Sequence, residues 1–265
     1  MAKVSRLKNI HKLIEAAVET LPPDESFLRE LTATIERGQD DYIPSKTYKP
    51  SSMKCIRNMY FQVTGEKPDP STASSELIGM GEIGSFRHEI LQGYISKMYK
   101  KGFDCKYIDV AEYIKIRNLD YLEIRGKQGF ETKLYNKALN ISFLCDGILL
   151  YNKQYYILEI KTESMYKWQG RRFIAEEHIP QATAYSVSLG IDKVLFLYEN
   201  RDLCGKKAYI LNITEEMKYD NVISVIETCD EYVKKLVVPP KPENLNRKTC
   251  EYCGYITACR RAGNE

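Results

Sequence analysis

The chain has 265 residues, of which 43% are hydrophobic and 28% charged, as is typical of a soluble globular protein with a substantial core. No apolar run approaches the roughly 20 residues that a membrane-spanning helix needs, so the sequence predicts no membrane partner and a cytoplasmic location. A net charge of +3 is too small to indicate a polyanionic partner by itself.

Helical patterns occupy the N-terminal part of the chain. Apolar residues recur at helical spacing over residues 4–18 with charges between them, which predicts an amphipathic helix rather than a signal peptide. A second helix is predicted over Asp24–Arg37, with Gly38 as its stop. We therefore expect a helical extension over residues 1–50, followed by one larger domain over residues 51–265.

Two further helices are expected before the strand-like runs begin. Ser51 or Ser52 is placed to cap a short helix that carries Cys55 and ends near Gly65. A longer helix is expected over about residues 76–100, although several glycines weaken its first half.

From residue 105 onward the chain is rich in β-branched and aromatic residues, which favours strands of a central sheet. The expected strands are CKYIDVAEYIKI, FETKLY, ISFLCDGILLY, QYYILEIKT, KVLFLYEN and KAYILNI. Helices are expected over about residues 164–189 and 215–236, and an irregular, cysteine-bearing tail follows Pro240. These elements predict an α/β fold.

Two carboxylates are expected to converge on adjacent strands. Asn152-Lys153 predicts a compact hairpin, and pairing around this turn places Asp146 opposite Glu159 to within a residue. Residues two apart on a strand share a face, so Lys161 points the same way as Glu159. Hard oxygen ligands of this kind suit Mg²⁺ or Mn²⁺, and Lys161 can orient a water or stabilise a developing anion.

A simpler interpretation of part of this pattern is a surface ion pair. Glu159 and Lys161 alone fit an exposed salt bridge on a half-solvated strand. Asp146, however, lies within the apolar run FLCDGILL, where a carboxylate is rarely tolerated without a partner or a metal. The apolar setting of Asp146 therefore favours a metal site.

Eight cysteines without a secretory signal favour metal-binding thiols over disulfides. Cys250, Cys253 and Cys259 form a C-x2-C-x5-C group, which lacks one ligand of a four-thiolate site. Cys55, on a predicted capped helix beside basic residues, is the best candidate for the fourth ligand, because the remaining cysteines lie in strand-like or helical interiors. The four cysteines interpreted as packing residues are Cys105, Cys145, Cys204 and Cys229.

A basic and aromatic segment directly follows Lys161. Trp168 is flanked by Lys167, Arg171 and Arg172, a grouping that suits base stacking and phosphate contacts on single strands or frayed ends. The alternative is an amphipathic segment in which Trp168 packs inward.

The order of these residues resembles that of the PD-(D/E)XK nucleases, specifically their RecB-type branch. The resemblance covers about Ser51 to Cys259 and implies a restriction-endonuclease-like core, with a central mixed sheet flanked by helices. The segments that carry the resemblance are Gly84-Ser85-Phe86-Arg87-His88, Asp146-Gly147, Glu159-Ile160-Lys161-Thr162, and Gln181 with Tyr185.

The resemblance also implies roles for residues that carry little signal alone. His88 is implied to be a further metal ligand, and Ile160 to contribute its backbone carbonyl. Gln181 and Tyr185, four apart on one helix face, are implied to position the substrate or the catalytic lysine.

One early cysteine joined with a C-terminal C-x2-C-x5-C resembles the iron-sulfur members of this branch, including AddB-like and CRISPR-associated proteins. The resemblance implies a 4Fe-4S cluster held by four thiolates, which would act as a structural clasp between distant parts of the chain. Four thiolates also satisfy tetrahedral zinc, which remains the alternative. The expected ligands are Cys55, Cys250, Cys253 and Cys259.

The implied activity is that of a metal-dependent deoxyribonuclease, an exonuclease or end-processing enzyme rather than an endonuclease. Recombination, repair or CRISPR spacer acquisition is the expected process, with DNA as substrate and a recombination or CRISPR adaptation protein as partner. A different class of function is a catalytically silent, cluster-bearing DNA-binding or scaffold subunit of a larger nuclease complex. The presence of Asp146, Glu159 and Lys161 argues against a silent site.

Overall fold

The computed structural model describes residues 22–37, 45–70, 73–243, 245, 247–251 and 253–263. The chain divides into two compact units, one of residues 1–41 with 71–79 and one of residues 42–70 with 80–265. None of the helices in the described ranges has the length and apolar character that a bilayer crossing needs. The predicted division of the chain at residue 50 stays a prediction.

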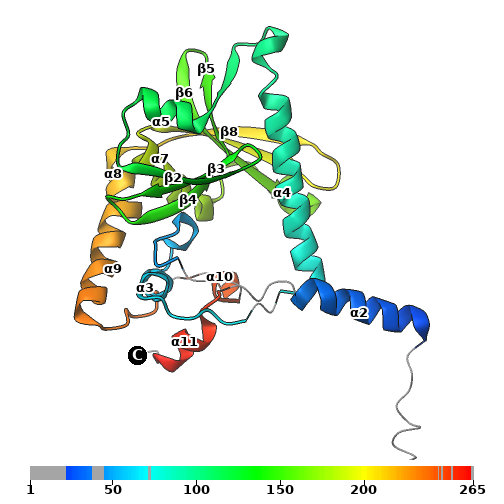
Figure 1. The fold of residues 1–265 in the computed structure, drawn as a ribbon, viewed down its shortest axis with the longest axis vertical. Coiled ribbons are helices and arrows are strands. Elements are labelled where there is room, and N and C mark those ends of the chain that lie inside the picture. The colour runs from blue at the N-terminus through cyan, green and yellow to red at the C-terminus, as the bar shows by residue number, and fades with distance from the viewer. Residues whose placement is uncertain are drawn as a thin grey trace, which may run out of the picture. The chain divides into compact units, whose positions relative to one another are not determined.

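Helix α2 (Pro23–Arg37) matches the second predicted helix (Figure 1). Its first residue is a proline, whose fixed φ suits the first helical position. The acidic residues of its first turn interact favourably with the positive end of the helix dipole. The helix predicted over residues 4–18 lies outside the described residues, and so does Gly38, the predicted end of the second helix.

The larger unit contains a five-stranded sheet, which confirms the predicted α/β fold with a mixed central sheet. Its strands are β1 (Cys105–Ile108), β5 (Gly147–Tyr151), β6 (Gln154–Glu163), β7 (Lys193–Asn200) and β8 (Lys206–Asn212). They lie in the order β1-β5-β6-β7-β8. β6 and β7 pair in parallel, and the other neighbours pair antiparallel.

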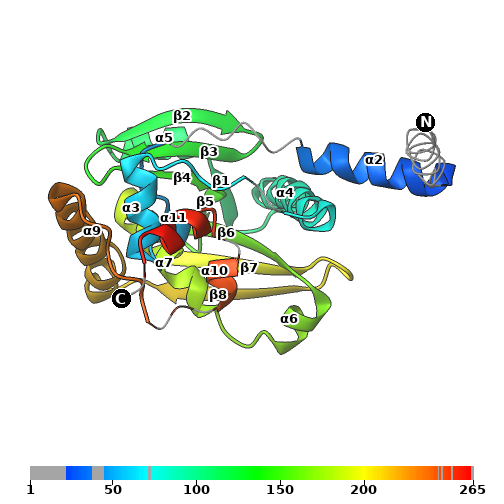
Figure 2. The same cartoon turned by 90° about the horizontal axis from the view of Figure 1, so that it is seen from below.

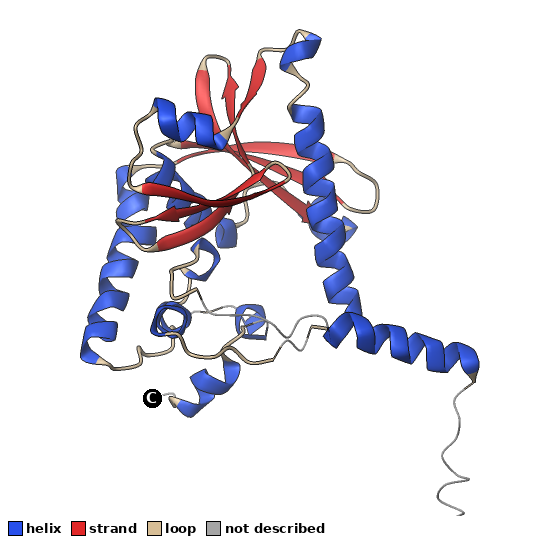
Figure 3. Cartoon of the chain, in the orientation of Figure 1, coloured by secondary structure: helices blue, strands red, loops and turns tan. Residues whose placement is uncertain are grey.

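A second, three-stranded antiparallel sheet was not predicted (Figure 3). It contains β2 (Leu122–Gln128), β3 (Glu131–Asn136) and β4 (Ile141–Cys145). β2 escaped prediction because all but its first residue are exposed, so it lacks apolar alternation. The single strand predicted for ISFLCDGILLY is wrong, because the chain breaks at Asp146 and the two halves join different sheets.

The turn between β5 and β6 confirms the predicted hairpin. Asn152 and Lys153 have positive φ angles of 48° and 61°. Two-residue hairpin turns with this backbone conformation match the right-handed twist of the strands that they join. Gly147 pairs with Leu158 in this hairpin. The same register, continued by one residue, places Asp146 beside Glu159.

The run CKYIDVAEYIKI was predicted to be one strand, which is wrong for its second half. β1 ends at Ile108, and helix α5 (Val110–Ile116) follows. The carboxylate of Asp109 accepts hydrogen bonds from the backbone amides of Ala111 and Glu112, at 3.0 and 3.3 Å. This N-cap outweighs the strand preference of the apolar residues after it.

Helix α4 (Ser75–Ile95) accounts for most of the predicted long helix, and a short 3-10 turn, η2 (Tyr99–Lys101), follows. The helical segments predicted over residues 164–189 are present as α6 (Met165–Gly170), η3 (Glu176–His178) and α7 (Ile179–Leu189). Pro180 stands in the first turn of α7, where a helix tolerates proline. The last long helix is present as α8 (Glu215–Lys218), a π-helical turn (Tyr219–Ile223) and α9 (Ser224–Lys235).

The residue that precedes helix α3 (Ile56–Thr64) is Cys55, so the predicted cap at Ser51 or Ser52 is wrong. Ser52 instead belongs to the 3-10 turn η1 (Pro50–Ser52). The predicted end of this helix near Gly65 is confirmed, and Gly65 adopts a left-handed conformation with φ 76°. The C-terminal part contains two short helices, α10 (Arg247–Glu251) and α11 (Ile256–Arg261).

The two faces of β6 pack against different layers (Figure 2). Leu158 and Ile160 are fully buried in an apolar cluster with Leu91 of α4. Ile157 belongs to the larger cluster on the opposite face, which includes Ala182 of α7. Because side chains alternate along a strand, the side chains of residues 159 and 161 lie on the α7 side.

Candidate metal centre

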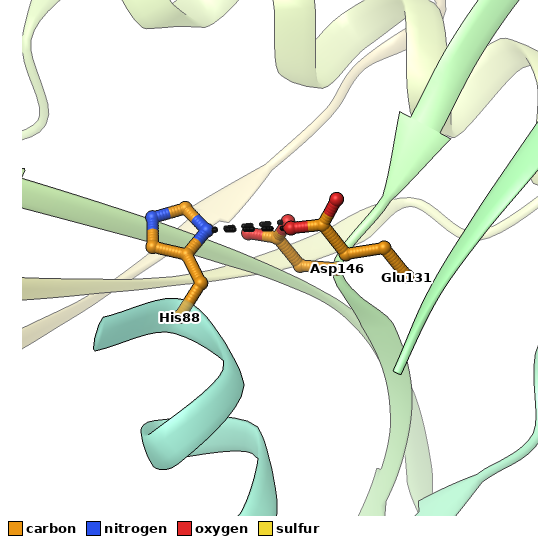
Figure 4. Close-up of side chains that lie close together, drawn as sticks. All are labelled: His88, Glu131 and Asp146. Carbon is orange, nitrogen blue, oxygen red and sulfur yellow. Dashed lines mark ion pairs between the residues drawn. The ribbon is translucent and has the colours of Figure 1, made fainter. Parts of the chain in front are cut away.

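Three potential ligands from separate elements converge where β5 begins (Figure 4). His88 of α4, Glu131 of β3 and Asp146 each place one ligand atom within 4.8 Å of the other two. His88 Nδ1 lies 3.6 Å from Asp146 Oδ1 and 3.7 Å from Glu131 Oε1. Imidazole and carboxylate groups are common ligands of divalent ions, so this group could hold one.

The electrostatics of this group favour a positive charge at its centre. Burial lowers the pKa of His88, but hydrogen bonds and charge interactions with Asp146 and Glu131 outweigh this effect and raise the pKa to about 9. The protonated ring thus compensates two carboxylates. A metal ion at the same place would compete with that proton, because metal-bound imidazole must be neutral.

Asp146 is held by both its side chain and its backbone. Its Oδ2 accepts a hydrogen bond from the backbone N–H of Ile160 at 2.7 Å. Its carbonyl oxygen accepts from Gln92 Nε2 and from the Tyr107 hydroxyl, each at 2.8 Å. A Cβ atom on the next residue, Gly147, would lie 2.5 Å from the Tyr107 ring, so only glycine fits there. These contacts leave Oδ1 directed toward His88.

Glu131 is a member of the group that the sequence did not indicate. It is half-buried at the first position of β3, and an acidic residue at the end of a strand is usually solvated. The antiparallel pairing of Thr132 with Cys145, continued by one residue, places Glu131 beside Asp146. A hairpin between the predicted strands FETKLY and ISFLCDGILLY was therefore the signal that could have identified Glu131, whereas His88 comes from a distant helix.

Glu159 and Lys161 form a close ion pair beside this group. Lys161 Nζ lies 2.6 Å from Glu159 Oε1, and the side chain of Glu159 is only 4% exposed. Burial raises the pKa of Glu159 to about 7, although Lys161 opposes the rise. Glu159 therefore needs neighbouring positive charge to remain ionised at neutral pH. This burial distinguishes the pair from an exposed salt bridge.

Lys161 is connected to α7 by a chain of hydrogen bonds. Its Nζ donates to Gln181 Oε1 at 3.2 Å, and Gln181 Nε2 donates to the Tyr185 hydroxyl at 2.6 Å. Burial raises the pKa of Tyr185 well above its usual range, so the hydroxyl stays neutral. Gln181 and Tyr185 thus lie where they can orient the ammonium group, and the role that the resemblance implies for them stays a prediction.

Two of the four residues predicted to bind substrate, Trp168 and Arg171, make contacts within the protein itself. Arg171 forms a two-pronged ion pair with Glu163. A Cβ atom on Gly205 would lie 2.9 Å from the Trp168 ring, and Lys207 Nζ lies 4.2 Å from that ring's centre, so Trp168 packs inward. Of the four predicted contacts, the two that are exposed are Lys167 and Arg172. A substrate role for the segment stays a prediction.

His178 is a half-buried histidine near Lys161 that the sequence did not single out. Its Nδ1 lies 2.9 Å from the Tyr198 hydroxyl, and its ring stacks on Phe196. Burial, reinforced by the positive charges of Lys161 and Arg171, lowers the pKa of His178 to about 3. The ring is therefore neutral in the folded protein at any pH near neutrality.

His178→Gln should make folding less sensitive to acid. The unfolded chain binds a proton at this histidine near pH 6.5, whereas the folded chain does not, so this contribution to stability is present above pH 6.5 and lost toward pH 3. Between pH 7 and pH 5, the wild type should lose about 1–2 kcal/mol more unfolding free energy than the variant. Urea titrations at both pH values measure this difference, and equal losses would contradict the prediction.

The four cysteines predicted to act together line one cavity of about 980 Å³. Asn58 Nδ2 donates to Cys253 Sγ at 3.2 Å, and Arg57 Nη1 to Cys259 Sγ at 3.4 Å. Burial raises the pKa of Cys55, and the neighbouring thiols of Cys253 and Cys259 raise it further. Cys250, from α10, completes the set.

The surroundings of these sulfur atoms suit a thiolate-bound group. Basic residues from several elements line the cavity, and hydrogen-bond donors to sulfur are the contacts that tune such groups. All four cysteines belong to the described part of the chain and carry free thiols. Their sulfur atoms do not lie as close together as the ligand atoms of His88, Glu131 and Asp146. Of the cysteines predicted to be packing residues, Cys105, Cys145 and Cys229 are buried, but Cys204 is exposed.

No protein-family model matches the sequence, and no curated protein matches it significantly. Among solved structures, the chain is similar to a protein crystallised as SSO0001, with 14% identity and a TM-score of 0.45 over 90% of this chain and 96% of that one. It is also similar to an alkaline exonuclease (LHK-Exo) from Laribacter hongkongensis, with 12% identity and a TM-score of 0.38 over 77% and 96%. At these TM-scores the likenesses assign no function to this chain.

Proposed function

We propose that the protein is a metal-dependent deoxyribonuclease of the PD-(D/E)XK type. The observation that carries this proposal is the convergence of His88, Glu131 and Asp146 beside the buried pair of Glu159 and Lys161. Ligands for a divalent ion and a fixed lysine are the groups that phosphodiester hydrolysis needs. The order of His88, Asp146, Glu159 and Lys161 along the chain resembles that of the RecB-type branch, which favours an exonuclease or end-processing activity.

The donor set suits Mg²⁺ or Mn²⁺, because two of its three groups are hard carboxylate oxygens. We infer that His88, Glu131 and Asp146 bind the ion, with Glu159 and the Ile160 backbone carbonyl as further ligands. When bound, the ion supplies Lewis-acid activation of a water and of a phosphate oxygen.

The remaining residues of the site control charge and orientation. Lys161 is held between Glu159 and Gln181, so its ammonium group is fixed in place before a substrate arrives. From there it can donate a hydrogen bond to an anionic phosphate oxygen and orient the attacking water. Tyr185 holds the amide of Gln181, and thereby the lysine.

Digestion of end-labelled oligonucleotides tests the proposed activity. We expect cleavage with Mn²⁺ or Mg²⁺, no cleavage in EDTA, and faster release from single-stranded or frayed ends than from blunt duplexes. Tight DNA binding without cleavage under any divalent ion would instead support the silent scaffold subunit and overturn the enzyme.

Glu131→Gln should weaken Mn²⁺ binding at least about 10-fold, because an amide oxygen without charge replaces one anionic ligand. Titration of free Mn²⁺ by electron paramagnetic resonance measures the affinity in the absence of substrate. Glu123→Gln is a matched control, since Glu123 lies on β2 of the same sheet and is exposed. Equal affinities of the two variants would remove Glu131 from the ligand set.

We also propose that the cysteine cavity holds a 4Fe-4S cluster, with zinc as the competing occupant. Four thiols at one cavity and hydrogen bonds to two of the sulfur atoms support a thiolate-bound group. Anaerobically purified protein with broad absorption near ~400 nm and bound iron would support the cluster. A colourless protein with stoichiometric zinc would reject it.

We propose that DNA binds along the segment that follows β6, which contains the predicted substrate contacts. Lys167 and Arg172 are exposed and can reach phosphates, while Trp168 and Arg171 shape the segment from within. Recombination, repair or spacer acquisition is the proposed process, and a protein of such a pathway the proposed partner.

A further inference from the structure

The helix that carries His88 contacts the five-stranded sheet at two neighbouring strands. A Cβ atom on Gly84 would lie 3.2 Å from Thr162 Oγ1, so α4 lies close to β6 at this point. One turn later, Arg87 pairs with Glu199 of β7. Thr162 and Glu199 are register partners, so the two contacts lie side by side across the sheet.

The contact between Arg87 and Glu199 is a two-pronged ion pair. Nε donates to Oε2 and Nη2 donates to Oε1, each at 2.8 Å, and this fork fixes direction as well as distance. The Glu199 side chain has no exposed surface, whereas that of Arg87 is 21% exposed. A second cation, Lys206 Nζ of β8, lies 3.1 Å from Glu199 Oε1 and does not belong to α4.

A third contact lies on the far side of His88. The buried Gln92 donates from Nε2 to the carbonyl oxygen of Asp146 at 2.8 Å. Gly84, His88 and Gln92 are four residues apart in turn, so they share one face of the helix. Three separate contacts fix the depth and rotation of a rigid helix, and therefore the place of the imidazole between them.

We propose that Arg87 and Glu199 are positioning residues for the metal centre. Their ion pair holds α4 in the rotation that presents His88 Nδ1 to Asp146 and Glu131. This inference rests on the proposed function, since it concerns how a ligand is placed rather than what the ligand does. It assigns a role in metal binding to a glutamate on β7 that the metal-ligand group itself does not include.

The test compares two substitutions that each remove one cation from the same carboxylate. Arg87→Met should weaken Mn²⁺ binding about 10-fold, the lower end of the effect of losing a supporting contact. Lys206→Met should change it by less than about 2-fold, because Lys206 is not on α4. Free Mn²⁺ is measured by electron paramagnetic resonance without DNA. Arg87→Lys keeps the positive charge but loses the two-pronged hydrogen bonding, so its Mn²⁺ affinity should lie between those of the wild type and Arg87→Met.

A double-substitution cycle separates positioning from general loss of structure. In a His88→Ala background, adding Arg87→Met should cause no further loss of Mn²⁺ affinity, because Arg87 acts through His88. An additive loss, or equal losses in Arg87→Met and Lys206→Met, would overturn the positioning role alone. Absence of Mn²⁺ binding by the wild type would overturn the proposed function and this inference together.

Discussion

Asp146→Asn should reduce metal-dependent DNA cleavage at least about 10³-fold while the protein stays folded. The substitution removes the negative charge that faces His88, yet an amide oxygen can still accept the hydrogen bond from the Ile160 backbone that Oδ2 now accepts. The change therefore acts on the ion more than on the fold. Initial rates on end-labelled DNA in saturating Mn²⁺, with thermal unfolding recorded in parallel, measure both effects.

A matched control for this substitution is Asp109→Asn. Asp109 caps α5 and pairs with exposed Lys127, and asparagine caps helices about as well as aspartate. Its activity should equal that of the wild type. Cleavage by Asp146→Asn at near wild-type rates would place the catalytic centre elsewhere in the protein.

Cys253→Ser should destabilise the whole larger unit if a cluster occupies the cysteine cavity. The cluster would join Cys55 to the C-terminal cysteines and close a loop of about 200 residues, for which a chain-entropy estimate gives about 5 kcal/mol. For a domain of this size the loss corresponds to a fall in Tm of about 10–20 °C. Differential scanning calorimetry of anaerobically purified protein, together with its visible absorption, measures both consequences.

Cys204→Ser is the control for this change, because Cys204 is exposed and does not line the cavity. It should retain both the Tm and the absorption of the wild type. If Cys253→Ser unfolds at the wild-type temperature, the cavity does not hold a stabilising clasp, whatever it contains.

The part of the site that sequence could predict depends on local patterns. Glu159 and Lys161 share a face because strand side chains alternate, and the turn at Asn152-Lys153 fixes the register that brings Asp146 to Glu159. Gln181 and Tyr185 form a pair because they are one helical turn apart. Each relation extends over a few residues and follows from a period of 2 or 3.6.

The part that escaped prediction depends on strand pairings and contacts that the sequence did not specify. Glu131 joins the metal-ligand group because β3 pairs with β4 in a second sheet. The break at Asp146 was hidden because apolar residues continue on both sides of it. The strand expected through residue 116 was wrong, because the cap at Asp109 determined the structure of the following residues.

The break at Asp146 would give a metal ion bound at this candidate site a mechanical effect as well. Glu131 belongs to the three-stranded sheet, His88 to α4, and Asp146 is the link through which the chain passes from one sheet to the other. An ion bound there would cross-link the smaller sheet to the larger one. Binding and release of the ion would then change the stiffness of the connection between the two sheets, as well as the chemistry of the site.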